Sequence, residues 1–474
     1  MEGGHRVSKE ISGNFLDWDL ITLSDAIRNK QISPVEVTRK MLERIAAEND
    51  QLNAYITVTD NEALAQAAKA EKEINAGNMK GYLHGIPIAL KDLIYTKDIT
   101  TTMGSEIYSE YIPDYDAAVV EKLKEAGAVI IGKLNTHQFA YGATGDRSFF
   151  GPVRNPYDTS KVSGGSSSGS GAAVAASLCY ASLGTDTGGS IRIPSSFGGI
   201  VGMRPTFGQV STYGVFPLCK TLDTIGPMTK TVKDNAVLLS LLAGFDERDL
   251  HSIQKDPEDF TRYLDKGVEG TVIGVPPSNF FDHVNEEITR DVHQAIETFR
   301  SLGAEIRTVE IPDLEQTLAA FRVTLKSEAY SGHVERLQEY PASQWDEEVR
   351  ERLLTGSTIT AHEYIQAQQV KQWAIREYNK MFSEVDVLVI PALPILPFDI
   401  NQRDIKINDS MEPVSLQLNR FTGSISLIGF PSLTVPCGMS NAGLPIGLQL
   451  VGKPFDEANL YRFGSALVGG MNNV

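Results

Sequence analysis

The stretch that decides how this chain folds runs from residue 163 to residue 171 and reads SGGSSSGSG. It leads directly into the small apolar run 172–176, which suits a tightly packed helix. A second glycine-serine loop, 188–190, follows the strand-like run 180–187. Two such loops around a packed helix indicate a place where backbone approaches a substrate closely, because glycine has no Cβ. A catalytic loop is favoured, and a flexible linker and a phosphate-binding loop are the alternatives.

Both alternatives lack a feature that they need. A linker separates two domains and has polar flanks, whereas 163–171 runs into an apolar helix. A nucleotide phosphate loop needs GK[ST] after its glycines, and none is present. The G-x-S-x-G pattern of a nucleophile elbow is also missing around Ser190. A Ser-His-Asp triad stays open, with His84 and His137 as its two candidate histidines, although a structural role is favoured for each.

Outside these loops, helices alternate with short buried strands. Ser33 begins a capping box with Pro34 in the first turn, and apolar residues at i+4 spacing predict a helix to about Ala47. A helix, a glycine and a strand follow one another twice, at 116–131 and 286–310. The other expected strands are 85–90, 385–390 and a hairpin of 432–436 with 444–451. This pattern predicts an α/β layered fold with helices on both faces of a mixed sheet.

The composition disfavours several classes of function. The chain has 474 residues, 42% of them hydrophobic, a net charge of −17 and a pI near 5.0. Binding to nucleic acid or to an anionic membrane is not expected, because it needs clustered Lys and Arg. The N-terminal residues show no signal-peptide pattern, and no apolar run is long enough to span a bilayer. Three widely spaced cysteines predict reduced, buried thiols, so a soluble cytoplasmic protein is expected.

The block from Val162 to Met228 resembles the amidase signature family. Members of that family carry a GGSS(G/S)GS loop, matched by 164–170, and a G(S/T)D(T/I)GGSIR loop, matched by 184–192. Their lysine follows a GIP(I/V)(A/L)(L/V)KD strand, matched by 85–92. Further matches at 150–156, 202–206, 222–227, 429–436 and 443–452 extend the resemblance over nearly the whole chain.

The resemblance implies a single amidase signature domain across residues 1–474, built as an α/β/α sandwich around a large mixed β-sheet. A helical segment at 20–60 lies at its N-terminal side. A C-terminal region at 310–425 is expected to cover the active site. The residues of this region singled out for that role are Phe321, Tyr364 and Thr422.

The same resemblance assigns the chemistry to a Ser-Ser-Lys triad. Ser190 corresponds to the family nucleophile, Ser166 to the bridging serine and Lys91 to the base. A serine hydroxyl needs a base to take its proton, and lysine serves only when burial and a nearby positive field lower its pKa. The family holds the peptide before the bridging serine, here Gly165–Ser166, in the cis form. The expected oxyanion hole consists of the backbone N–H groups of Thr187, Gly188, Gly189 and Ser190.

Some further residues have expected roles. Asp186 and Arg192 flank the nucleophile loop and are interpreted as a structural pair. Tyr141 lies in a segment that matches the family near its acyl pocket, which makes it a candidate substrate-binding residue. No metal-ligand cluster is found in the sequence, so neither a metal nor another cofactor is expected. The expected partner is a small-molecule amide, bound by a monomer or a homodimer.

The predicted activity is cleavage of the C–N bond of a small carboxamide through an acyl-enzyme on Ser190, giving an acid and ammonia or an amine. Two alternatives share the fold and triad: the glutaminase (A) subunit of a tRNA-dependent amidotransferase, and a hydrolase of a urea-like amide such as biuret or allophanate. The glutaminase alternative is disfavoured because its usual SRYG segment reads STYG at 211–214. A binding protein without chemistry would have a broken triad, and all three positions are intact.

Overall fold

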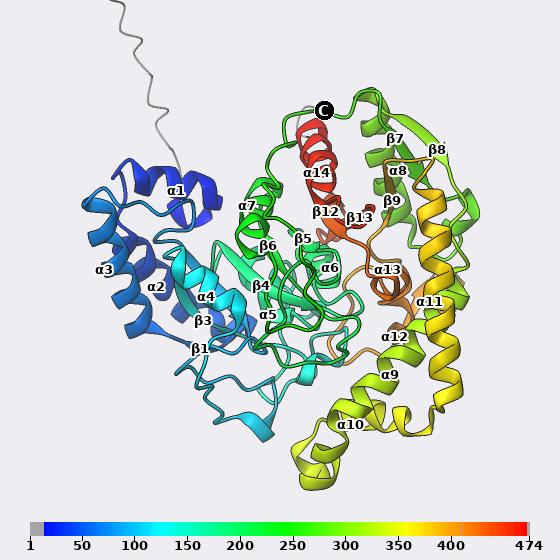
Figure 1. The fold of residues 1–474 in the computed structure, drawn as a ribbon, viewed down its shortest axis with the longest axis horizontal. Helices are drawn as coiled ribbons and strands as arrows, with labels where there is room; N and C mark the ends of the chain where they lie inside the picture. The colour runs from blue at the N-terminus through cyan, green and yellow to red at the C-terminus, as the bar shows by residue number, and fades with distance from the viewer. Residues whose placement is uncertain (1–13, 408, 472–474) are drawn as a thin grey trace, which may run out of the picture.

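The computed structural model of the chain describes residues 14–407 and 409–471. The expectation of a missing signal peptide concerns residues 1–13 and lies outside this part. The described residues form a large β-sheet with its covering helices and a small separate β-ribbon (Figure 1). None of the helices in these two ranges is long and apolar enough to cross a membrane.

The main sheet is mixed, as the final hairpin predicted. β2 is parallel to its neighbours β3 and β4, whereas the strands from β4 to β9 in the spatial order are antiparallel to one another. β10 (Asp404–Ile407) and β11 (Ser410–Pro413) form the ribbon. In spatial order, the main sheet consists of β1 (Tyr55–Val58), β3 (Val129–Leu134), β2 (Pro87–Lys91), β4 (Ala181–Asp186), β6 (Thr224–Thr229), β5 (Val201–Arg204), β12 (Ser432–Met439), β13 (Pro445–Val451), β9 (Val387–Pro391), β7 (Val272–Val275) and β8 (Glu305–Thr308).

Helices pack on both faces of this sheet. On β12, Leu433 contacts Gly464 of one helix, α14. On the neighbouring β13, Gln449 bonds to Arg192 of another helix, α6. Leu433 pairs with Leu450, the residue after Gln449, and successive strand residues point to opposite faces, so α14 and α6 lie on opposite sides. The sheet is thus the middle layer of an α/β/α sandwich.

The helices differ widely in length and position. Figure 1 shows α1 to α3 gathered with β1 at one end of the molecule, while the long α9 and α11 lie along the other side. The helices are α1 (Leu20–Arg28), α2 (Pro34–Leu52), α3 (Asp60–Asn75), α4 (Ala118–Glu125), α5 (Ser168–Ala175), α6 (Arg192–Phe197), α7 (Val232–Leu242), α8 (Glu286–Ser301), α9 (Leu314–Glu339), α10 (Glu347–Leu354), α11 (Ala361–Met381), α12 (Val414–Gln417), α13 (Gly423–Ile428) and α14 (Glu457–Met471).

The N-cap predicted at Ser33 is confirmed, but among the described residues Glu36 does not make the reciprocal bond of a capping box, and the end of α2 is corrected. The Ser33 hydroxyl accepts hydrogen bonds from the N–H groups of Val35 and Glu36 at 3.1 and 3.2 Å, and so caps the helix. The helix continues past the predicted end near Ala47, because no residue there breaks it. It stops before Asn53, whose φ of +54° places it in the left-handed region typical of a helix end.

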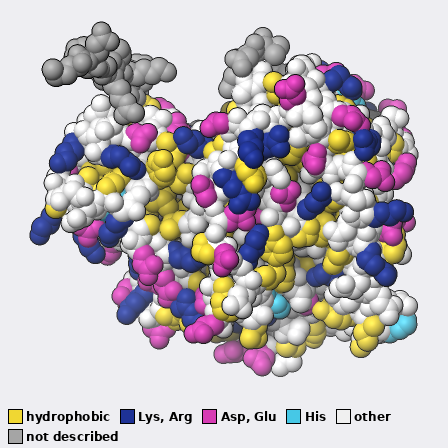
Figure 2. Space-filling view, turned by 45° about the horizontal axis from the view of Figure 1, so that its top comes forward, with side chains coloured by type: hydrophobic (Ala, Val, Ile, Leu, Met, Phe, Trp, Pro, Cys, Tyr) yellow, Lys and Arg dark blue, Asp and Glu magenta, His cyan; other side chains and the backbone are white. Residues whose placement is uncertain are grey.

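Other predicted elements are confirmed with small shifts of their ends. The helix, glycine and strand sequence appears as α4, Gly127 and β3, and again as α8, Gly303 and β8. The predicted hairpin is the antiparallel pair β12 and β13. The cysteines Cys179, Cys219 and Cys437 are buried and form no disulfide. On the face drawn in Figure 2, acidic and basic side chains are interspersed.

Candidate active site

Lys91 is held at the end of strand β2 by two hydroxyl groups. It is the last residue of β2, and its side chain is fully buried. Its Nζ donates to Ser166 Oγ at 2.7 Å and to Thr185 Oγ1 at 2.8 Å. Thr185 lies on β4, the parallel neighbour of β2, so the sheet fixes one of these contacts. Ser166 comes from the first glycine-serine loop, and the Gly165–Ser166 peptide is cis, as expected.

The charge state of Lys91 depends on its burial. Burial lowers the pKa of this amine from 10.5 to about 7, and the negative charges of Asp223 and Asp186 oppose the shift. The expectation that a nearby positive charge helps to lower this pKa is wrong, because both charged groups that act on the amine are carboxylates. Desolvation is therefore the cause of the lowered pKa. Near neutral pH, a large share of Lys91 is uncharged and able to accept a proton through Ser166.

Ser190 lies in the loop between β4 and α6, beside a cavity of about 280 Å³. Only 8% of the residue is exposed, and its hydroxyl makes no hydrogen bond within the described part of the chain. Its carbonyl accepts from the N–H of Ser167 at 3.2 Å. This bond joins the two glycine-serine loops, so the sheet, the first loop and the second loop meet where the sequence places the triad.

The glycines before Ser190 are needed for both backbone conformation and space. Gly189 has a φ of +127°, a conformation that strains any residue with a side chain. At Gly188, a Cβ would clash with the ring of Phe321 on α9. The Gly188 carbonyl accepts from the hydroxyl of Thr422 at 2.6 Å and from the Asn419 amide. The loop is therefore oriented by residues more than 100 positions away in sequence.

The N–H groups of this loop are not equivalent. The N–H of Gly189 donates to Asp186 Oδ1 at 2.9 Å and is already engaged. Within residues 14–407 and 409–471, the N–H groups of Thr187, Gly188 and Ser190 have no acceptor. Of the four donors that the sequence suggested for an oxyanion hole, three are thus available in this geometry.

A buried ion cluster of Asp186, Arg192 and Arg204 lies next to the loop that contains Ser190. Arg192 Nε and Nη2 each donate to the Asp186 carboxylate at 3.0 Å, and Arg204 Nη1 donates to it at the same distance. All three side chains are fully buried. The two arginines hold the pKa of Asp186 well below its usual range, against the opposing effect of burial. The pairing of Asp186 with Arg192 that the sequence suggested is confirmed.

The residues expected near the substrate are partly brought together. Tyr141 lines the cavity beside Ser190, is 3% exposed, and has a hydroxyl without a hydrogen-bond partner in the described chain. Phe321 lines the same cavity, and Thr422 contacts the loop. Tyr364 does not line it; its hydroxyl donates to Glu328 at 2.9 Å.

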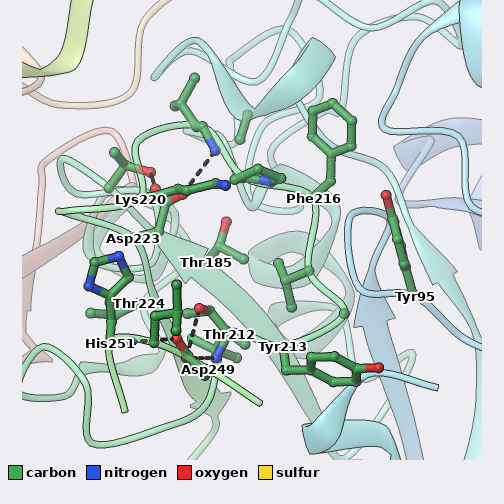
Figure 3. A pocket seen from close by; sticks show the side chains of 18 of the residues that line it. Tyr95, Thr185, Thr212, Tyr213, Phe216, Lys220, Asp223, Thr224, Asp249 and His251 are labelled. Carbon is green, nitrogen blue, oxygen red and sulfur yellow. Dashed lines mark hydrogen bonds between the residues drawn. The ribbon is translucent and has the colours of Figure 1, made fainter. Parts of the chain in front are cut away.

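A second cavity, of about 350 Å³, opens on the Thr185 side of the site. Figure 3 shows Thr185 between Asp223 on one side and the aromatic ring of Tyr95 on the other. Asp223 accepts from the Thr187 hydroxyl at 2.6 Å, and burial raises the pKa of this carboxyl to about 6. The two cavities share the lining residues Ala140, Thr187 and Leu218.

Neither candidate histidine is hydrogen-bonded to Ser190. His84 Nε2 lies 3.0 Å from Glu73 Oε2, beneath α3. His137 Nδ1 accepts from the N–H of Gly145 at 3.3 Å, and burial lowers the pKa of its ring to about 3. The histidines therefore occupy structural positions, as favoured from the sequence.

Sequence reasoning missed three residues that contact this centre. Thr185 and Asp223 lie inside motifs that were recognised, but no role was assigned to them. The available signal for Thr185 was its position near the end of β4, directly before the nucleophile loop. Asn419 carries no local signal, since its contact with the loop depends on how distant segments pack.

Comparison with known proteins identifies the family of the chain. The family model named Amidase matches residues 36–461. A glutamyl-tRNA(Gln) amidotransferase subunit from Geobacter sp. (strain M21) is 42% identical, over 94% of this chain and 95% of the relative. A solved structure from a vestigial protein complex, described in connection with the origins of an s-triazine catabolic enzyme, has a TM-score of 0.91 at 32% identity, covering 95% of this chain and 98% of its own. The structure of the same amidotransferase subunit from Thermotoga maritima has a TM-score of 0.81 at 33% identity, covering 96% and 95%. The chain belongs to the amidase signature family.

Proposed function

We propose that the chain hydrolyses the carboxamide of a small molecule through an acyl-enzyme on Ser190. Lys91 accepts the proton of Ser166 as Ser166 accepts that of Ser190, and Ser190 Oγ attacks the amide carbonyl. The proton returns to the departing nitrogen, which leaves as ammonia or an amine. Water then attacks the ester by the same relay, releasing the acid and restoring Ser190.

The observation that carries this proposal is the buried 2.7 Å bond between Lys91 and Ser166. A lysine with a pKa near 7 is matched to proton transfer at neutral pH. The available N–H groups of Thr187, Gly188 and Ser190 are the proposed oxyanion hole. Each such donor contributes about 3 kcal/mol of transition-state stabilisation in comparable sites.

A second candidate is the glutaminase subunit of a tRNA-dependent amidotransferase. The 42% identity to the Geobacter amidotransferase subunit, over nearly all of both chains, favours it. In this role the same acyl-enzyme would form from glutamine, and the ammonia would pass to a partner protein. Thr212, in place of the arginine usual in that subunit, favours the free-standing hydrolase.

Ammonia or amine release by the purified chain tests the proposal. The panel contains short aliphatic amides, aryl amides, anilides, glutamine and biuret, and Ser190→Ala is the control. Release by the chain alone that is lost in the variant supports the free-standing hydrolase. Release from glutamine that needs the other amidotransferase subunits supports the second candidate. Release that persists in the variant contradicts the role of Ser190 in either.

A further inference from the structure

The cavity beside Ser190 carries three cationic side chains. Arg322, Lys326 and Arg352 line it, and no Asp or Glu is among the described residues of its wall. The chain as a whole has 60 acidic and 43 basic residues. The local charge of the wall is therefore opposite to the net charge of the molecule.

Two of these cations have no counter-ion from the protein. Arg322 and Lys326 are half-buried on α9, four residues apart, and lie on the same face of the helix. Within the described residues, neither side chain forms an ion pair or a hydrogen bond. Placing like charges at this spacing destabilises a helix in isolation, so an anion in the cavity would relieve that repulsion.

Arg352 is oriented toward the cavity wall by Tyr141. Its Nη1 donates to the Tyr141 carbonyl, and its guanidinium carbon lies 5.5 Å from the centre of the Tyr141 ring. The other guanidinium N–H groups have no acceptor in the described chain. The buried Tyr141 hydroxyl also lacks a partner, which is uncommon for a buried polar group. A carboxylate can accept from the free guanidinium N–H groups of Arg352.

The lining of the cavity disfavours a ligand that carries an ammonium group in addition to its negative charge. A buried ammonium group is best stabilised by a carboxylate, and no Asp or Glu is among the described residues that line this cavity. It would also lie among three cations. An uncharged ligand would leave those cations without compensation. The wall thus favours a ligand with net negative charge.

We infer that the substrate is a short anionic monoamide: a dicarboxylic acid with one carboxyl converted to the carboxamide and no α-ammonium group. Its carboxamide lies at Ser190 and its carboxylate binds Arg352, with Arg322 and Lys326 adding positive charge. Hydrolysis consumes one water and yields the dicarboxylate and ammonia. The inference rests on the proposed function, because it takes Ser190 as the nucleophile.

Three amides of equal length separate the possible charge patterns. Glutarate monoamide is the anion, pentanamide replaces its carboxylate by a methyl group, and glutamine adds an α-ammonium. The wild-type kcat/KM for the monoamide should exceed that for each of the other two by about 10-fold or more, the effect of one hydrogen bond to a charged group. Equal values, or a preference for pentanamide or glutamine, would overturn the inference while leaving the hydrolase in place.

Arg352→Gln should lower the monoamide-to-pentanamide ratio of kcat/KM by about 10-fold. Lys326→Gln should change it in the same direction by less. The matched control is Arg376→Gln, which removes an exposed cation of α11 outside the cavity and should keep the wild-type ratio. A fall of the ratio in the control as large as in Arg352→Gln would point to the overall charge of the molecule and contradict the proposed anchor.

A binding measurement decides the inference without turnover. In calorimetry, Ser190→Ala should bind glutarate monoamide saturably, and adding Arg352→Gln should weaken binding about 10-fold. Absence of binding by the folded Ser190→Ala variant overturns the inference even if the wild type hydrolyses other amides. Binding by a wild type that hydrolyses no amide supports the cavity assignment and removes the proposed function.

Discussion

Lys91 links the physical chemistry of the site to its proposed activity. Its pKa of about 7 results from burial, and the two nearby carboxylates prevent a larger decrease. The amine accepts a proton only in its neutral form, which becomes more populated as the pH rises. The pH dependence of catalysis is therefore a direct readout of this residue.

We expect kcat/KM to increase with pH and to level off above an apparent pKa of about 7. The measurement is initial rate at low substrate concentration from pH 5.5 to 9, with a substrate whose own charge does not change in this range. Lys91→Met, which cannot accept a proton, should be inactive throughout. A profile that is flat across neutral pH would contradict a titrating lysine base.

Ser190→Ala should remove turnover and leave the free energy of unfolding nearly unchanged, because the Ser190 hydroxyl makes no hydrogen bond within the described chain. Ser195→Ala is a matched control on the following helix. Its hydroxyl is also buried and without a partner, so this variant should keep both activity and stability. Rates and urea unfolding of the two variants test this. Equal loss of activity in both would indicate general sensitivity of the region to substitution.

At the scale of elements, the nucleophile loop depends on the ion cluster beneath β4 and α6. Asp186 closes β4, Arg192 begins α6, and the loop between them contains Ser190. Removing one partner from a buried ion pair leaves the other charge unsolvated, which costs far more than losing a surface pair. The cluster therefore fixes both the stability of this region and the position of the loop.

Arg192→Met should lower the free energy of unfolding by about 3–5 kcal/mol, since it leaves the buried Asp186 with one arginine. Arg300→Met is the surface control. Arg300 pairs with Glu297 where more than half of each side chain is exposed, so its loss should cost under about 1 kcal/mol. Chemical denaturation measures both. A similar small cost for the two variants would contradict a bracing role for the cluster.

Local sequence signals predicted most elements because they depend on short-range chemistry. The cap at Ser33 and the glycine stops at Gly127 and Gly303 are set within a few residues of each helix end. The end of α2 was misplaced, because Asn53 adopts a left-handed conformation that other residue types at that position would seldom adopt. Ends that depend on one such residue are the least predictable.

At the scale of the whole molecule, the sequence predicts the catalytic residues of the site but not the cations of its cavity wall. The sequence predicts Lys91, Ser166 and Ser190 because each lies in a motif of the amidase signature family, and the motifs follow one another in the family's order. Arg322, Arg352 and the other cations of the cavity wall have no motif around them. They meet only because α9 and α10 pack against each other, an arrangement that spacing along the chain does not specify.

The free energy of unfolding of the whole molecule should depend on pH in a way that reflects the titration of Lys91. Between pH 7 and 10.5 the unfolded chain binds more protons at this residue than the folded chain, so its contribution to the free energy of unfolding rises with pH. The slope is at most about 1.4 kcal/mol per pH unit. Denaturation of the wild type and Lys91→Met from pH 7 to 9 should show a steeper rise for the wild type. Parallel curves would contradict the lowered pKa.

The proposed chemistry depends most directly on an acyl-enzyme at Ser190, and the mass of that intermediate is its most direct test. The wild type is mixed with a slowly hydrolysed amide, quenched in acid during turnover, digested and analysed by mass spectrometry. We expect the peptide containing Ser190 to gain the mass of the acyl group, and Ser190→Ala treated in the same way to gain none. An acyl group on another residue, or steady turnover with no modified peptide under any quench time, would contradict an acyl-enzyme at Ser190.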